Sequence, residues 1–235
     1  PHRRIPAGAK QRRRSLKHRG VDIRIPGPAW LGRHAPILPD RLTLHLVAYL
    51  LAKGTLMWTV QYHRYGNPEV MRLEQAATPT LRSGEVLLET ISSGVSGVDT
   101  LYRSGQLRLH GVGFPKQPGF DALGIIRESR IPGIEPGRWG WTVLGIEPFK
   151  TRGTAVQFLP LDAERLGLFP PGFAPDVDAG ALPLGALTAW RALTHAARPQ
   201  PGDRLLIVGA GGPVGTSLIQ LARYLGYEVD AVAGQ

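Results

Sequence analysis

The sequence predicts an α/β protein in which a small barrel or sandwich of short strands precedes a strand–helix–strand unit that opens a nucleotide-binding fold. The first part is indicated by short runs of β-branched and aromatic residues from Met57 to about residue 165, separated by Gly, Pro and Asn. The second part is indicated by a glycine-rich turn at 209–215, which lies between an apolar run and an amphipathic helical pattern.

The composition divides the 235-residue chain at Met57. The formal net charge is +10, and residues 1–56 hold 12 of the 28 Lys and Arg but only 2 of the 18 Asp and Glu. The rest of the chain therefore holds 16 of each sign and is neutral. The chain has no cysteine, which excludes disulfides, thiolate nucleophiles and Cys-based zinc sites.

Three interpretations of residues 1–56 are open. A nucleic-acid-binding arm would use Arg12, Arg13, Arg14 and Lys17 as phosphate contacts, but no aromatic residues lie among these charges. An organellar transit peptide would be Arg-rich and acid-poor, as here, but also Ser-rich. The preferred interpretation is a basic, disordered or non-native leader with Met57 as the natural start, because neutral, well-patterned sequence begins there. The apolar stretch 42–52 is too short to span a bilayer.

The barrel part is expected to contain six strands. A hairpin joins the first two across the turn Gly66-Asn67-Pro68, and a Pro- and Gly-rich loop joins the fourth to the fifth. In chain order the strands are expected at 57–66, 69–73, 85–95, 122–128, 141–146 and 154–161.

The region after the barrel is expected to be helical. Single turns are predicted at 162–166 and 176–182, the second with acids at its positive N-terminus. A longer helix is predicted from 184 to 196, with Leu187, Trp190 and Leu193 on one face.

The strand–helix–strand unit begins with Leu205–Val208, a continuous apolar run typical of a strand buried on both faces. A helix follows with Leu218, Ile219, Leu221, Ala222 and Leu225 on its apolar face. Gly226 is expected to end this helix, and 228–232 is expected to form the second strand.

The glycine-rich turn has the chemistry of a phosphate site, because free N–H groups and the helix dipole hold an anion at a helix N-terminus. Gly212 would let a pyrophosphate approach the backbone, and Gly215 would let the helix pack close to its strand. Pro213 suits a first helical turn. The second strand ends Val232-Ala233-Gly234 with no acid for a ribose 2′-hydroxyl, which favours NADPH over NADH.

Several ordered motifs resemble those of the medium-chain dehydrogenases/reductases, in particular the zinc-independent quinone oxidoreductase (zeta-crystallin-like) branch. The resemblance covers about Met57 to Gln235. It implies a GroES-like β-barrel catalytic domain at 57–180, and the first β-α-β unit of a Rossmann domain at 181–235. The motifs are GVSGVDTLYRSG (94–105), PGFDALGII (118–126), EPGRWGWTVLG (135–145), DAGALPLGALTAWRAL (178–193) and PGDRLLIVGAGGPVGTSLIQLAR (201–223).

The same resemblance bears on zinc. Where the zinc-dependent branch has a Cys in the first motif and a His-Glu pair in the second, this chain has Ser96 and Phe120-Asp121. Asp121 alone cannot form a tetrahedral site that needs three protein ligands. His63, His110 and His195 are isolated in the sequence. We therefore expect no zinc.

The resemblance implies hydride transfer from NADPH to a quinone or an activated enone. Ser96 and Asp99 would then lie beside the nicotinamide and substrate, and Tyr102 would be a substrate contact or proton donor. The family's usual aromatic aligns with Leu101 instead, so Tyr102 could equally be a packing residue. The cofactor-binding residues implied are Thr188, Ala210, Gly211, Gly212, Pro213, Val214, Gly215 and Gly234.

Two other functions remain as alternatives: a zinc-type alcohol dehydrogenase relative and a non-catalytic nucleotide- or nucleic-acid-binding protein. A doubly wound domain has six strands, and the chain supplies two. We therefore expect a C-terminally truncated fragment that is inactive by itself. The expected location is cytoplasmic, with no nucleic acid or membrane partner, and a homodimer is conceivable for the full-length protein.

Overall fold

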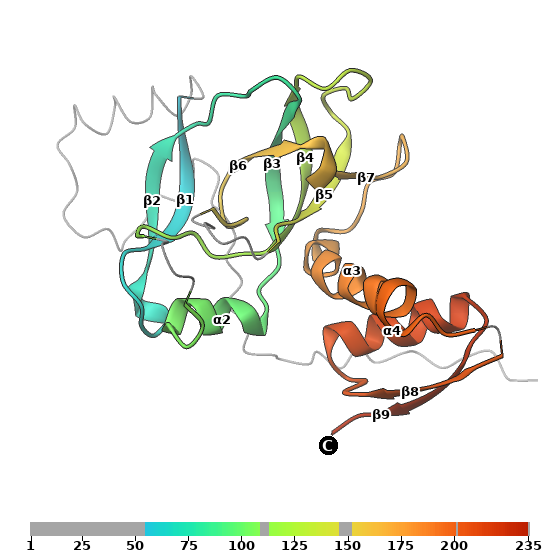
Figure 1. Cartoon of the computed structure of the whole chain (residues 1–235). Helices are drawn as coiled ribbons and strands as arrows, with labels where there is room; N and C mark the ends of the chain where they lie inside the picture. Colours follow the sequence, from blue (N-terminus) through green and yellow to red (C-terminus); the bar gives the residue numbers. More distant parts are fainter. Residues whose placement is uncertain (1–54, 109–112, 146–151, 201, 235) are drawn as a thin grey trace, which may run out of the picture. The chain divides into compact units, whose positions relative to one another are not determined.

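The computed structural model describes residues 55–108, 113–145, 152–200 and 202–234 (Figure 1). The predictions for residues 1–54 and for His110 lie outside these ranges. The described chain confirms the predicted fold class, since antiparallel strands come first and a parallel strand–helix–strand unit comes last.

In the described residues of the first part, the chain forms seven strands. A ribbon of β1 (Leu56–Tyr62) and β2 (Met71–Ala77) is antiparallel, and a five-stranded sheet has the order β6-β3-β4-β5-β7. The strands of this sheet are β3 (Glu85–Ser93), β4 (Asp121–Ser129), β5 (Trp139–Val143), β6 (Phe158–Asp162) and β7 (Gly167–Leu168).

Backbone hydrogen bonds join the ribbon to the sheet. In β1, the Val60 N–H donates to the Ala155 carbonyl, and the Trp58 carbonyl accepts from the Gln157 N–H. The Gln157 carbonyl in turn accepts from Thr90 of β3. Residues 155–157 therefore bridge β1 and β3, which gives the curved, barrel-like arrangement visible in Figure 1.

The hydrophobic core lies inside this arrangement. Inward-facing side chains of three strands meet there, as the alternation of a half-buried sheet requires. Its fully packed members are Val86, Leu88, Ile126, Leu144, Leu159 and Leu161.

Several strand predictions were wrong at their boundaries: the strand predicted at 57–66 ends at Tyr62, and the one predicted at 141–146 is Trp139–Val143. The short strand β7 was not predicted. The strand predicted at 154–161 begins only at Phe158, because residues 154–157 turn to bridge β1. The strand predicted at 69–73 begins at Met71, because Pro68–Val70 forms a 3₁₀ turn (η1) with Pro68 at its start.

The helical region was predicted in its existence and, apart from Trp190, in its packing face. Short turns η2 (Ala163–Arg165) and η3 (Val177–Ala181) precede helix α3 (Pro183–Arg191), which continues as one wide turn, η4 (Ala192–Ala197). Trp190 is 42% exposed, whereas Gly185, Ala189 and Leu193 are buried. Of the predicted face, Leu193 is buried and Leu187 is half-buried as expected, and only the placement of Trp190 was wrong. The side of α3 that packs against α4 includes Gly185, which lies close to Pro213.

The last unit consists of β8 (Arg204–Val208), α4 (Pro213–Tyr224) and β9 (Glu228–Val232). β8 and β9 are parallel, and α4 packs on both. Gly226 ends the helix as predicted, with φ +85° and its N–H bonded to the Arg223 carbonyl. Leu225 was predicted to lie on the apolar face of the helix. This was wrong, because Leu225 lies beyond the helix end and is 39% exposed.

β8 is not buried on both faces, contrary to prediction. Ile207, on the α4 side, is 6% exposed, whereas Leu206 and Val208 are 67% and 75% exposed. Val232 of β9, which pairs with Val208, is 51% exposed. No described element covers this second face, so the continuous apolar run misled the prediction. None of the helices in the described ranges has the length and apolar character needed to cross a lipid bilayer.

Candidate functional site

The first predicted site segment folds as helix α2 (Gly97–Ser104), with Ser96 at its N-cap. The Asp99 carboxylate is 8% exposed, and its Oδ2 accepts from the Ser96 N–H at 2.8 Å and the Ser96 hydroxyl at 2.9 Å. Its Oδ1 accepts from the Gly119 N–H at 2.8 Å. Asp99 therefore ties α2 to the second motif, at 118–126, and fixes Ser96 with its hydroxyl proton directed at a carboxylate.

Tyr102 lies one helical turn beyond Asp99 on the same buried side of α2. Its ring packs against Phe120 at 5.6 Å between centroids, and it is 8% exposed. Its hydroxyl is buried with no hydrogen-bond partner in the part of the chain that the structure describes, and burial raises the pKa of this phenol. Leu101, which aligns with the family's aromatic, is 41% exposed.

These contacts favour a packing role for Tyr102. We expect Tyr102→Phe to raise the free energy of unfolding by about 1 kcal/mol, because it removes a buried hydroxyl without a partner. Urea unfolding measures this. Tyr227→Phe is the matched control, since the Tyr227 hydroxyl donates to the Pro199 carbonyl at 3.0 Å and its loss should lower stability. A drop in stability of Tyr102→Phe would contradict the packing role.

Tyr62 lies at the end of β1 and is 3% exposed. Burial, with contributions from Tyr65 and Asp99, raises its pKa to about 12. Because this lies above the ordinary tyrosine value, the protonated phenol stabilises the fold at neutral pH, and this contribution is lost as the pH rises from about 10 to about 12.

We therefore expect the free energy of unfolding of Tyr62→Phe to fall less than that of the unchanged chain when the pH is raised from about 10 to about 12. Urea unfolding at several alkaline pH values checks it. Tyr224→Phe is the control, because Tyr224 is 86% exposed and should leave the alkaline loss unchanged. An equal alkaline loss with Tyr62→Phe would rule out this assignment.

The glycine-rich turn forms a closed loop between β8 and α4. Gly209 has φ +82°, and the N–H groups of Gly209 and Ala210 both donate to the Val232 carbonyl at 2.9 Å. The Gly212 N–H donates to the Gly209 carbonyl at 3.1 Å. Gly212 is the N-cap of α4 and Pro213 its first residue. The first helical hydrogen bond runs from the Thr216 N–H to the Gly212 carbonyl. The N–H groups of Val214 and Gly215 come before that donor, have no acceptor within the helix and are therefore available to an anion.

The two glycines at the helix start have different surroundings. A Cβ on Gly215 would overlap the Gly209 carbonyl and lie 2.7 Å from the Ala210 Cα. A Cβ on Gly212 would meet only the Gly209 carbonyl oxygen at 3.5 Å. Gly215 is thus needed for the helix to pack on its loop, whereas the space beside Gly212 is open to a ligand. The loop as folded fits a dinucleotide pyrophosphate.

The remaining predicted cofactor residues flank this loop. Ala210 is 6% exposed, and its N–H is used by Val232, so it shapes the loop. The Thr188 hydroxyl on α3 donates to the Leu184 carbonyl, which leaves its oxygen able to accept. Gly234 follows β9 and is exposed, and a Cβ on Gly211 would lie 3.9 Å from the Ala233 Cβ. The strand tip therefore lies beside the loop.

Asp121 connects the two predicted parts of the site, a role that the sequence analysis missed. Its carboxylate is almost fully buried and accepts from the Leu184 N–H of α3 at 2.9 Å. Its neighbour Phe120 contacts Tyr102. The only signal in the sequence was the Asp121 carboxylate beside Phe120, and it was interpreted solely as a possible zinc ligand.

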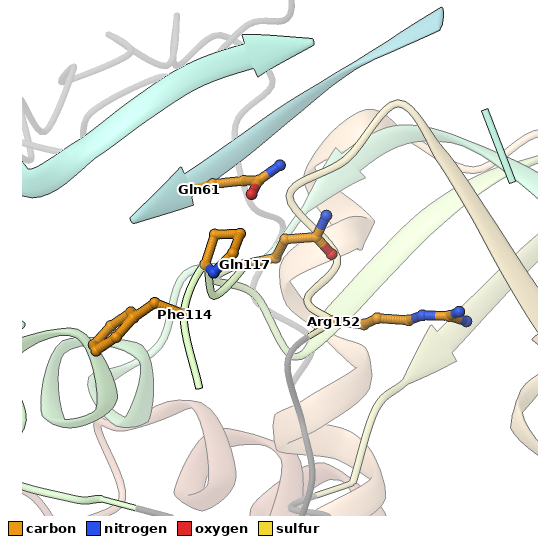
Figure 2. Close-up of a pocket in the computed structure, with 5 residues that line it drawn as sticks. Gln61, Phe114, Gln117 and Arg152 are labelled. Carbon is orange, nitrogen blue, oxygen red and sulfur yellow. The ribbon is translucent and has the colours of Figure 1, made fainter. Parts of the chain in front are cut away.

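Metal ligands are not gathered in the described ranges. There, no three or more His, Asp or Glu side chains lie close enough to hold an ion. A separate hollow of about 320 Å³ lies beside β1 and is lined by Gln61, Phe114, Pro115, Gln117 and Arg152 (Figure 2). It includes none of the predicted site residues. Gln117 bonds Thr59 and Gly153 from there.

Comparison with known proteins identifies the family. No family model matches the chain. It is 33% identical over 180 residues to the quinone oxidoreductase of Rattus norvegicus, covering 76% of this chain and 53% of that protein. It is 26% identical over 170 residues to the 2-methylene-furan-3-one reductase of Solanum lycopersicum, covering 70% and 43%.

Among solved structures, an alcohol dehydrogenase superfamily protein from Novosphingobium aromaticivorans matches with a TM-score of 0.67 and 29% identity, covering 76% of this chain and 54% of that one. The chain belongs to the medium-chain dehydrogenase/reductase superfamily. It spans about half the length of the curated relatives it matches. The quinone oxidoreductase of Lama guanicoe is likewise similar, with 31% identity over 182 residues, covering 76% of this chain and 53% of that protein.

Proposed function

We propose that this chain is part of an NADPH-dependent oxidoreductase that reduces a quinone or an activated enone without zinc. The observation that carries the proposal is the loop 209–215, which offers the Val214 and Gly215 N–H groups at a helix N-terminus beside open space at Gly212. The names of the two curated relatives, a quinone oxidoreductase and a furanone reductase, support the substrate class.

The chain's own residues divide the work as follows. Val214 and Gly215 bind the pyrophosphate, and Gly211 and Gly212 leave room for it. Thr188 and Gly234 lie near the cofactor, and Ser96 contacts the nicotinamide or substrate through its hydroxyl oxygen. Asp99 positions Ser96. When bound, NADPH supplies the hydride that the acceptor takes up together with a proton.

The preference for NADPH over NADH rests on the end of β9. Val232, Ala233 and Gly234 carry no carboxylate that would bond a ribose 2′-hydroxyl or repel a 2′-phosphate. Asp230 is held in an ion pair with Arg204 at 3.2 Å. It therefore lies away from the strand tip.

The positions aligned with zinc ligands are occupied by other interactions. The Ser96 hydroxyl donates to Asp99, the Phe120 ring packs on Tyr102, and the Asp121 carboxylate accepts from Leu184. None of these is a set of three ligands of the kind that catalytic zinc requires. This supports reduction without a metal.

Fluorescence titration with NADPH and NADH tests the cofactor, using the 235-residue chain and the full-length gene product. Loss of NADPH absorbance with a panel of quinones and enones tests the reaction. We expect NADPH to bind more tightly than NADH, the 235-residue chain to show no turnover, and the full-length product to show turnover that survives a zinc chelator. Chelator-sensitive alcohol oxidation by the full-length product would instead support a zinc-type dehydrogenase, and nucleotide binding by that product without turnover would support a non-catalytic protein. The cytoplasmic location and the homodimer remain predictions.

A further inference from the structure

Helix α3 lacks a capping residue of its own. Its N-cap is Leu182, which has no side-chain acceptor, and its first residue is Pro183, which has no N–H. The first helical bond runs from the Ala186 N–H to the Leu182 carbonyl. The Leu184 N–H is therefore the first donor that needs an acceptor from outside the helix.

Asp121 provides that acceptor from a distant strand. Its Oδ2 lies 2.9 Å from the Leu184 nitrogen, and the residue is 2% exposed. A carboxylate at the positive end of a helix adds a charge–dipole attraction to the hydrogen bond, and burial strengthens both.

The surroundings hold the carboxylate in place. The Asp121 carbonyl accepts from the Gly94 N–H at 3.0 Å and from the Thr154 hydroxyl at 2.9 Å. A Cβ on Gly94 would overlap the Asp121 carboxylate. Gly94 therefore leaves just enough room for Asp121 to reach α3.

Gly185, the residue of α3 that follows Leu184, lies against Pro213 in the glycine-rich loop 209–215. A Cβ on Gly185 would lie 3.0 Å from the Pro213 carbonyl oxygen and 3.1 Å from its Cβ, so the two backbones are in close contact. Pro213 immediately precedes Val214 and Gly215, whose N–H groups form the proposed pyrophosphate site. A shift in the first turn of α3 is thus transmitted to that site.

We propose that Asp121 is a positioning residue for the cofactor: by capping α3 it fixes the helix against Pro213 and so sets the position of the Val214 and Gly215 N–H groups. This inference rests on the proposed function. Asp121 touches neither cofactor nor substrate, and its effect is on nucleotide affinity.

The test compares Asp121→Leu, a close match in shape without an acceptor, with Asp121→Asn, which keeps one acceptor oxygen but not the charge. Gly94→Ala displaces the carboxylate without removing it. Asp162→Leu is the matched control, because Asp162 caps the short turn η2 at an exposed site. Two readouts are taken: hydrogen exchange of the Leu184 and Gly185 amides, and the Kd for NADPH.

We expect faster exchange at Leu184 and Gly185 and a Kd for NADPH raised about tenfold or more in Asp121→Leu and Gly94→Ala, since small misplacements at a distance from a site weaken it strongly. Asp121→Asn should recover part of both effects, and Asp162→Leu should show neither. Unchanged NADPH affinity in Asp121→Leu would overturn the inference.

The two proposals fail in different ways. If the unchanged protein does not bind NADPH, the proposed function fails, while the exchange measurement still tests the cap. If Asp121→Leu does not fold, Asp121→Asn and Gly94→Ala still decide. If they fold and bind NADPH normally, the positioning role is excluded.

Discussion

Replacing Gly215 with valine is expected to lower the free energy of unfolding by about 2–3 kcal/mol and to abolish nucleotide binding. The new side chain would overlap the Gly209 carbonyl and crowd the Ala210 Cα. Because α4 is held against β8 and β9 at this point, the helix must move away from the loop. The N–H groups of Val214 and residue 215 would then no longer converge.

Gly212→Ala is the matched control for that substitution. Gly212 has φ −84°, which suits alanine, and its Cβ would meet only one atom at ordinary contact distance. Stability should therefore remain unchanged, while the methyl group occupies space proposed for the pyrophosphate and weakens NADPH binding. Urea unfolding and NADPH titration of both variants provide the data. Gly215→Val with full stability would show that the loop is not as closely packed as described.

Removing the Asp99 carboxylate is expected to have the largest effect on stability. Asp99→Ala leaves three donors without an acceptor, namely the buried Gly119 N–H and the half-buried Ser96 N–H and Ser96 hydroxyl. Each such group costs about 1–3 kcal/mol, and because the costs are not additive we expect a total of about 3–5 kcal/mol. Thermal or urea unfolding measures the loss.

Asp99→Asn should recover little of this stability. Both oxygens of the Asp99 carboxylate accept from N–H groups, one from Ser96 and the other from Gly119. In Asp99→Asn the NH₂ group replaces one of these oxygens, so two donors would face each other there. Asp162→Ala serves as control, because it removes an exposed cap of η2 and should cost about 1 kcal/mol. If Asp99→Ala were no more destabilising than Asp162→Ala, the three bonds would not hold the two loops together.

Local sequence signals predicted the last unit well. Its apolar run, its turn and Gly226 lie within thirty or so residues, and each position depends on its neighbours in the chain through helix and turn geometry. In this unit the prediction that β8 is buried on both faces was wrong. The exposure of Leu206 and Val208 depends on which elements cover β8, and the sequence of the strand does not contain that information.

Contacts between distant residues were beyond sequence reasoning. Asp99 binds Gly119, and Asp121 binds Leu184 across 63 positions, so neither partner could be read from spacing. Which of the neighbours Leu101 and Tyr102 is buried also depends on a contact with a distant residue, Phe120. One step along a helix rotates a side chain by about 100°, which directs Tyr102 toward Phe120 and leaves Leu101 outside.

The two hydrogen bonds that the Val232 carbonyl accepts, from the Gly209 and Ala210 N–H groups, determine when the loop 209–215 can be completed. Gly209 and Ala210 precede α4, yet the oxygen that fixes their N–H groups comes from the last residue of β9. During synthesis the loop therefore remains unfinished until the helix has formed and the second strand has docked. A polypeptide ending before Val232 would carry every glycine of the motif and still lack the closed loop.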